Sequence, residues 1–189
     1  MYPGASNTEL CPTRFFSGDP LYRAGQEPDA MEVGRRRTRY WWPYHLALNR
    51  ELQRLRAKHR YVVHWDGHSI RSQIPWLFEG KLPDLNLGTA DGASCAPSLR
   101  IALMRALSTQ THYTHVTDGR FKGGYTTRHY GKPHEGVHTV QMEMCQSTYM
   151  DELPPFAIDH VRARQVRHVL RELLWVAEGW RPTADEELR

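Results

Sequence analysis

The stretch PHEGVHTVQMEM, residues 133–144, decides the fold, because it can form either a helix or a strand. It contains His-Glu-x-x-His, a spacing that places two histidines on one helix face in zinc proteases. Pro133 and Gly136 disfavour a helix, and β-branched residues follow Gly136. In a strand, His134 and His138 would lie about 13 Å apart at roughly 3.3 Å per residue. One zinc ion could not bind both, since its bonds to nitrogen are about 2 Å long. We therefore predict a turn followed by a strand.

Alternation along this strand sorts its side chains onto two faces. The face expected to pack on the core carries His138, Val140, Met142 and Met144. The more polar face carries Val137, Thr139, Gln141 and Glu143. If helices cover both faces of the sheet, Glu143 needs a partner, because an unpaired carboxylate is costly to bury. On an edge strand the same carboxylate would face water, and the pattern leaves both alternatives open.

The remaining chain alternates between helical and extended patterns. Helices are predicted at about 29–59, at 97–109 and at 158–179. Strands are predicted at 61–66 and after residue 114. Residues 1–29 and 67–97 look irregular, and residues 181–189 are expected to form a polar, frayed tail. Pro43 is expected to end or kink the first helix. Strands separated by helices predict a layered α/β domain with a largely parallel or mixed sheet.

Composition sets the broad class of the protein. The chain has 189 residues, of which 40% are hydrophobic, enough for one core and a single domain over residues 1–189. Its formal charge of +4 suits anionic partners without singling out nucleic acid. The three cysteines, Cys11, Cys95 and Cys145, do not form a disulfide framework and indicate a reducing compartment. No apolar run approaches the roughly 18–20 residues needed to span a bilayer. We expect a cytoplasmic protein without membrane partners.

The segment HWDGHSIRS, residues 64–72, directly follows an apolar strand. Ligands of α/β proteins bind beyond the carboxyl ends of strands, so polar residues at this place are candidates for a site. Asp66 and His68 are two residues apart, and a carboxylate that orients a histidine supports it as a metal ligand. A buried histidine that is hydrogen-bonded to Asp66 without any metal is the alternative. Arg71 could hold a substrate carboxylate through two hydrogen bonds.

Two basic segments are interpreted as solvent-exposed surface rather than as binding sites. GRFKGGYTTRHYG, residues 119–131, could bind an anion, but the sequence favours a solvated basic hairpin. GRRRTR, residues 34–39, lies on a predicted helix and favours a solvated face. No recognisable nucleic-acid-binding module accompanies it, so no nucleic-acid partner is expected.

Four long strings resemble the N-formylglutamate deformylase (N-formylglutamate amidohydrolase) family. They are YPGASNTELCPTRFFSGDPLY, RYWWPYHLAL, WDGHSIRSQIPWLFEGKLPDLNLGTADGASC and GRFKGGYTTRHYGKPHEGVHTVQMEMCQSTYMDE. The resemblance covers nearly the whole chain and rests on long ordered strings rather than a short pattern. It implies a fold similar to zinc-dependent exopeptidases, a three-layer α/β/α sandwich with a mixed, largely parallel sheet.

The resemblance also implies an activity, namely metal-dependent hydrolysis of N-formyl-L-glutamate to formate and L-glutamate in histidine degradation. By analogy, His68 would bind zinc with support from Asp66, and Glu143 would be the general base. Candidates for binding the dicarboxylate substrate are Arg71, Arg128, Asn86 and His129. Zinc would polarise the formyl carbonyl and activate water, and arginines suit a substrate with two carboxylates.

One departure from the family concerns the start of the chain. Family members begin further upstream, with a first strand, a Pro-His-Ser-Gly-like motif and further acidic residues, none of which precedes Met1. The resemblance therefore implies an N-terminally truncated chain with an incomplete zinc site, an exposed sheet edge and weak activity. The alternative is a non-catalytic remnant that retains an anionic-ligand pocket through Arg71 and Arg128. The sequence leaves the oligomeric state open.

Overall fold

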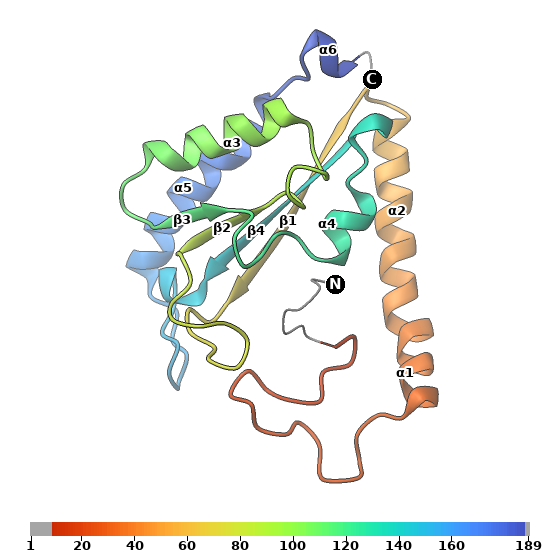
Figure 1. Ribbon diagram of the computed structural model, residues 1–189, viewed down its shortest axis with the longest axis vertical. Helices are drawn as coiled ribbons and strands as arrows, with labels where there is room; N and C mark the ends of the chain where they lie inside the picture. Colours follow the sequence, from red (N-terminus) through yellow and green to blue (C-terminus); the bar gives the residue numbers. More distant parts are fainter. Residues whose placement is uncertain (1–8, 188–189) are drawn as a thin grey trace.

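A four-stranded sheet organises the fold in the computed structural model, which describes residues 9–187 (Figure 1). In spatial order the strands are β1 (Val62–Ile70), β4 (Val137–Cys145), β2 (Leu85–Gly88) and β3 (His115–Thr117). β1 pairs with β4 and β2 with β3 in parallel, while β2 and β4 are antiparallel. The expected α/β fold with a mixed, largely parallel sheet is confirmed.

The segment that opened the sequence argument is not a helix that could present two histidines. Pro133–Glu135 forms a short 3-10 turn, η2, which ends at Gly136 in the left-handed region with φ of 72°. β4 then runs through the middle of the sheet, between β1 and β2. His134 is exposed, whereas His138 is buried and its Nδ1 accepts a hydrogen bond from the Ala96 amide. The prediction of a turn followed by a strand is confirmed.

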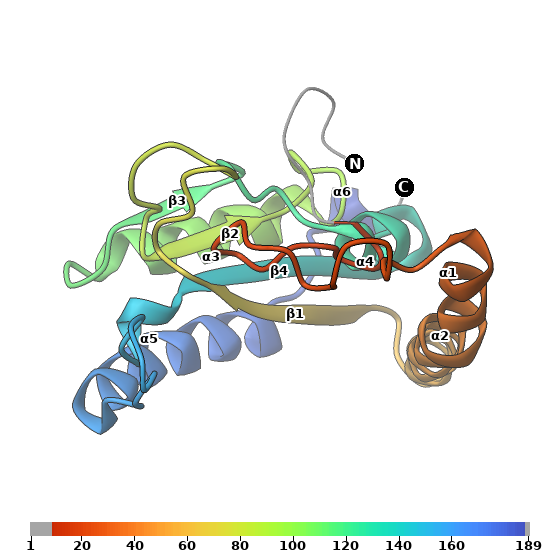
Figure 2. The same cartoon turned by 90° about the horizontal axis from the view of Figure 1, so that it is seen from below.

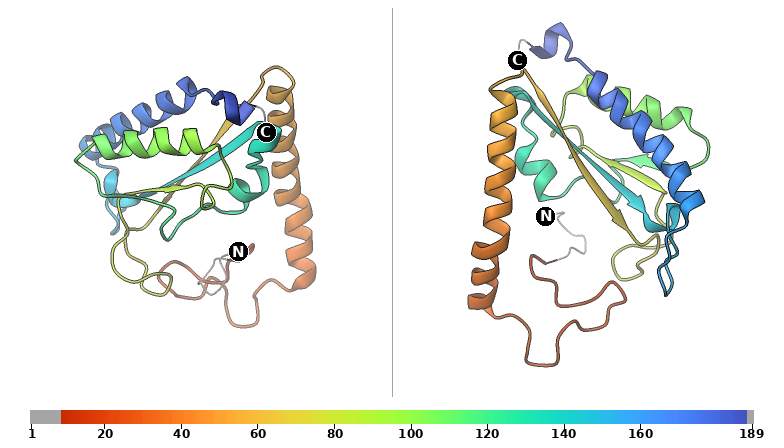
Figure 3. Two further views of the ribbon diagram at one scale, coloured as in Figure 1. Left: turned by 45° about the horizontal axis from the view of Figure 1, so that its top comes forward. Right: turned by 180° about the vertical axis from the view of Figure 1, so that it is seen from behind.

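Two helices cover one face of the sheet. They are α3 (Pro97–Thr109) and α5 (His160–Gly179), which lie side by side in both views of Figure 3. Val140 and Met142 of β4 pack between them in the main core, together with Leu103 of α3 and Leu173 of α5. Each such fully buried side chain contributes about 1.5–3 kcal/mol through removal of apolar area from water. The methionine-bearing face of β4 therefore packs on the core, as its alternation indicates.

The opposite face of β4 lies beneath a short helix, α4 (Tyr125–Tyr130). This helix replaces the solvated basic hairpin expected for residues 119–131, so that prediction was wrong. Thr127 and Tyr130, three residues apart on α4, are buried against the interior. Burial of that helical face decides the local structure, and six residues are too few for the period to be visible in the sequence.

A long helical rod stands beside the sheet. It consists of α1 (Ala30–Arg36), the π-helical segment η1 (Arg37–Trp41) and α2 (Trp42–Arg56). In Figure 2 the rod lies on the other side of the molecule from α5. Pro43 does not end the helix: it is the second residue of α2, two residues after the end of the π-helical segment η1. A local change of helix type accommodates the proline, because proline has no N–H to donate to the preceding turn.

Three other predictions about local structure need correction or restriction. The irregular stretch 67–97 contains the end of β1 and all of β2, whose four residues Leu-Asn-Leu-Gly give little strand signal. The tail is not frayed over its described part, because it contains α6 (Ala184–Glu187) and the Glu186 carboxylate accepts hydrogen bonds from both the amide and the hydroxyl of Ser98. Residues 1–8 and 188–189 lie outside the described residues. Within residues 9–187, no helix has both the length and the apolar character that crossing a bilayer requires.

Candidate active site

Three predicted residues form a row across three neighbouring strands, all on the α4 side of the sheet. His68 of β1 pairs in register with Glu143 of β4, and Glu143 pairs with Asn86 of β2. Directly paired residues project from the same face of a sheet, so the side chains of the row are neighbours. His68 and Glu143 are therefore neighbours on one face of the sheet.

Asp66 and His68 form a hydrogen-bonded pair. Nε2 of His68 lies 3.0 Å from Oδ1 of Asp66. The Asp66 side chain is 14% exposed, while that of His68 is 49% exposed and so remains open to solvent or a ligand. The hydrogen bond to Asp66 raises the pKa of His68, because the carboxylate stabilises the protonated imidazole. The carboxylate therefore orients this histidine, as its spacing suggests.

Glu143 is buried, which decides between the two alternatives left open by the sequence. It is 6% exposed in the central strand, not on an edge. Burial raises its pKa to about 7, because the charged form loses hydration, while the nearby His68 opposes that shift. A carboxyl with a pKa near neutrality can both accept and return a proton at physiological pH.

Asn86 has a structural contact as well as a free acceptor. Its Nδ2 donates to the Pro83 carbonyl at 2.7 Å and to the Glu143 carbonyl at 3.1 Å. Its Oδ1 is buried without a hydrogen-bond partner among the described residues. The side chain therefore fixes β4 against the start of β2 and leaves one oxygen unused.

Two polar residues of this face received no role from the sequence. Gln141 lies two residues before Glu143, and its Nε2 is 3.5 Å from Oε2 of that glutamate. His64 lies two residues before Asp66, and its buried Nδ1 has no partner among the described residues. Burial lowers the pKa of His64, which favours the neutral imidazole. The period of two along each strand is the signal that could have identified both residues.

Arg71 lies beyond the carboxyl end of β1, apart from the row. One guanidinium nitrogen donates to the Glu152 carbonyl at 3.1 Å. Its Nε is buried and has no hydrogen-bond partner among the described residues. A cavity of about 630 Å³ opens at this place, with Phe16 and Trp76 among its walls. Arg71 thus lines a cavity, and one of its buried donors lacks a partner among the described residues.

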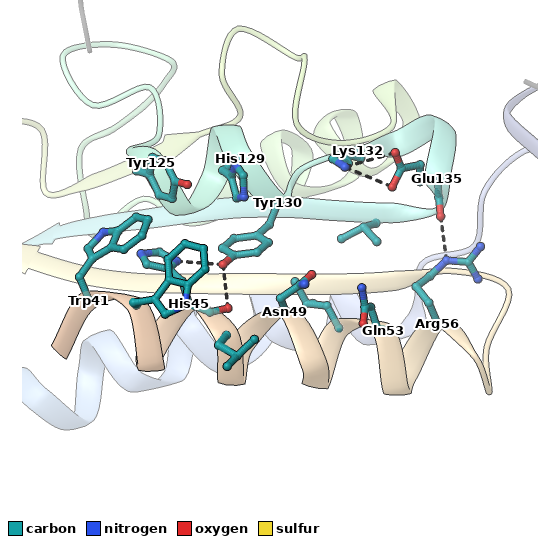
Figure 4. A pocket seen from close by; sticks show the side chains of 14 residues that line it. Trp41, His45, Asn49, Gln53, Arg56, Tyr125, His129, Tyr130, Lys132 and Glu135 are labelled. Carbon is teal, nitrogen blue, oxygen red and sulfur yellow. Dashed lines mark hydrogen bonds and ion pairs between the residues drawn. The ribbon is translucent and has the colours of Figure 1, made fainter. Parts of the chain in front are cut away.

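Arg128 and His129 lie on α4 rather than beside Arg71. The exposed Arg128 donates from Nε to the Gly123 carbonyl at 2.9 Å. His129 lines a second cavity, of about 660 Å³, between α2 and α4 (Figure 4). The rings gathered at one end of it are those of Trp41, His45, Tyr125, His129 and Tyr130. Arg71 thus lies beside the cavity beyond β1, whereas Arg128 lies on α4.

A resident metal needs more donors than these residues provide. A catalytic zinc ion normally has three protein ligands. Within residues 9–187, no group of three histidine, cysteine, aspartate or glutamate side chains is arranged to hold a metal ion. Asp66 and His68 instead bind one another. The described residues therefore do not fit a complete zinc site.

Comparison with known proteins agrees with the α/β architecture. The family model for N-formylglutamate amidohydrolase matches residues 1–150. The chain belongs to the N-formylglutamate amidohydrolase family. A family member of known structure, the N-formylglutamate amidohydrolase from Ralstonia eutropha JMP134, superimposes with a TM-score of 0.70 at 27% sequence identity, over 85% of this chain and 57% of that one.

Two further relatives in the family are more similar in sequence. An N-formylglutamate deformylase from Pseudomonas putida is 48% identical over 180 residues, which cover 95% of this chain and 67% of that protein. The corresponding protein of Pseudomonas aeruginosa is 49% identical over 175 residues, covering 93% and 66%. The chain thus spans about two thirds of the length of these relatives.

Proposed function

We propose that this chain hydrolyses N-formyl-L-glutamate to formate and L-glutamate. Membership of the family and the names of the two Pseudomonas relatives support this substrate. The observation that carries the proposal is the place of Glu143: buried in the central strand, with His68 directly across on β1. A buried carboxylate beside an open histidine has the geometry of a general base next to a substrate site.

The chemistry assigned to these residues is addition of water to an amide. Glu143 takes a proton from water, and the water oxygen bonds to the formyl carbon to give a tetrahedral intermediate. The carbon–nitrogen bond then breaks, and the proton held by Glu143 passes to the leaving nitrogen. His68, protonated more readily because of Asp66, would donate a hydrogen bond to the negative oxygen that develops on the formyl group.

Substrate recognition is assigned first to Arg71. Arg71 lines a cavity past the end of β1, three residues beyond His68, where its guanidinium could bind a carboxylate of glutamate. Asn86 could contribute its free oxygen to the substrate from the row itself. Arg128 and His129 are proposed as secondary contacts from α4, and they require the substrate to reach across the sheet face.

Two further proposals accompany the activity. Zinc binding that involves His68 and Asp66 is tested by metal analysis of the purified chain, and no step above depends on it. A cytoplasmic location is proposed because all three cysteines are free: Cys11 is partly exposed, and Cys95 and Cys145 are buried. Free thiols persist in reducing compartments.

The test is a direct assay of formate release from N-formyl-L-glutamate by the purified chain. We expect saturable formate release that is lost in Glu143→Gln and weakened in Arg71→Gln, the latter mainly through KM. Glu172→Gln, a half-exposed position of α5 outside the row, is the matched control and should retain full activity. Absence of turnover by the folded wild-type chain would refute the proposal.

A binding protein without catalysis is the second candidate, favoured by the unpartnered Nε of Arg71. Such a protein would bind glutamate or N-formyl-L-glutamate without releasing formate. Calorimetric titration with both compounds distinguishes the two functions. Binding that depends on Arg71 but leaves the formyl group intact would favour the second candidate.

A further inference from the structure

Gln141 makes two hydrogen bonds that connect the proposed base to the loop before α4. Its Oε1 accepts from the Gly124 amide at 2.8 Å, and its Nε2 lies 3.5 Å from Oε2 of Glu143. Gln141 is 4% exposed, and its contact with Glu143 is buried, while its contact with the exposed Gly124 is only partly buried. Among the residues that the structure describes, no hydrogen bond reaches Oε1 of Glu143. The carboxylate is thus held by one oxygen and has the other available.

The partner of Gln141, the loop of residues 122–124, is itself fixed. The Ala90 amide donates to the Lys122 carbonyl at 2.6 Å, and Nζ of Lys122 binds the Asp91 carboxylate at 2.9 Å. A Cβ on Gly88 would lie 2.7 Å from the backbone nitrogen of Gly123, so only glycine permits this approach without a shift. The loop therefore offers the Gly124 amide to Gln141 from a defined position.

The loop after β2 owes its shape to a buried carboxylate. Ala90 and Asp91 have φ angles of 52° and 57°, in the left-handed region that non-glycine residues rarely occupy. Asp118 contacts this segment: its Oδ1 accepts from the Thr89 amide at 2.7 Å and from the Asp91 amide at 3.3 Å, and its Oδ2 pairs with Arg100 at 3.0 Å. Backbone strain of this kind is maintained only where surrounding contacts determine it, and it is concentrated near functional sites.

We propose that Gln141 is a positioning residue that fixes the Glu143 carboxylate for catalysis by connecting it to the Gly124 amide. This inference rests on the proposed hydrolase function and adds a residue to it. Glu143 needs an orienting contact because its side chain otherwise rotates, and misplacement of a reacting group by about 1 Å can cost 100-fold in rate. Gln141 supplies that contact without a charge of its own.

The test uses two substitutions that separate the two hydrogen bonds. Gln141→Met keeps the length of the side chain and removes both contacts. Gln141→Glu keeps an acceptor for the Gly124 amide and removes the donor to Glu143. We expect kcat for formate release to fall roughly 10- to 100-fold in both, with KM changed by no more than about threefold. Thr139→Val is the matched control, because Thr139 is buried on the same face and its hydroxyl has no partner among the described residues.

The outcomes discriminate between positioning and simple structural support. If Gln141→Glu keeps the wild-type kcat, or if a folded Gln141→Met does, positioning is refuted while the hydrolase function stands. A loss of kcat in both variants, with retained thermal stability and unchanged Thr139→Val, supports it. If Gln141→Met does not fold, the Gln141→Glu result decides alone. A folded wild-type chain without formate release overturns both this inference and the proposed function.

Discussion

The two faces of β4 are buried to the same degree but have opposite chemistry. Val140 and Met142, at 0% and 1% exposure, pack on α3 and α5. Thr139 and Glu143, at 0% and 6%, lie on the α4 side beside polar atoms that lack partners. Apolar contacts on one face stabilise the fold, while burial of a carboxyl group on the other face destabilises it. The comparison indicates that one strand serves stability on one side and chemistry on the other.

The largest effect that would separate the two faces is expected for Glu143→Gln. Removal of a general base lowers the rate by about 100- to 10,000-fold. The unfolding midpoint in urea should not fall, because a buried ionisable group is replaced by a neutral one of the same shape. Rate and midpoint are measured on the same preparation. Equal losses of rate and of stability would remove the distinction between the faces.

On the apolar face, Met142→Ala should give the opposite result. Truncating a fully buried methionine leaves a cavity and lowers the free energy of unfolding by about 2–5 kcal/mol. The remaining folded protein should keep its kcat, because Met142 points away from the row. Chemical denaturation monitored by tryptophan fluorescence measures the loss. A destabilisation below about 1 kcal/mol would show that this face is not the main core.

His138 sharpens the comparison through pH, since it lies on the apolar face. Burial lowers the pKa of His138 to about 4, from a usual value of 6.5. The unfolded chain therefore takes up a proton below pH 6.5 that the folded chain does not, so stability falls as the pH drops from 6.5 towards 4. A shift of this size corresponds to about 3 kcal/mol.

The measurement is the free energy of unfolding as a function of pH in three proteins. His138→Gln should show a weaker dependence between pH 6.5 and 4 than the wild type. His134→Gln, at an exposed position, should follow the wild type. An identical slope in all three would show that His138 titrates normally in the folded state.

The smallest effect is expected for Thr139→Val on the polar face. The Thr139 hydroxyl is buried without a partner among the described residues, so its removal relieves a desolvation cost. We expect the free energy of unfolding to rise by up to about 1 kcal/mol. A loss of more than about 1 kcal/mol would reveal a partner for this hydroxyl, such as a buried water molecule.

The alternation of β4 could be predicted because a period of two is evident over eight residues. The contact between Asp66 and His68 could be predicted in the same way, because residues two apart on a strand lie on the same face. The sequence could not reveal α4 and β2, since elements of six and four residues are too short to show periodicity. Their structure is decided by burial against β4, which is a tertiary effect.

Roles that depend on distant contacts were equally inaccessible to sequence reasoning. The sequence predicts both Arg71 and Arg128 as anion-binding residues. It does not predict that Arg71 lies beside a cavity beyond β1 while Arg128 lies on α4, because these positions depend on the tertiary fold. Gln141 was visible as a neighbour of Glu143, yet its bond to Gly124 depends on the fold of residues 118–124. The burial of Glu143 could not be predicted without the order of the strands, which places β4 inside the sheet.

The central claim is that the polar face of β4 holds Glu143 in an environment where its carboxyl group exchanges a proton near neutral pH. The most direct measurement is a pH titration of that carboxyl by difference infrared spectroscopy, with Glu143→Gln identifying its signal. We predict a midpoint at about pH 7. A carboxyl that stays ionised down to its usual pKa, near 4.5, would contradict the account.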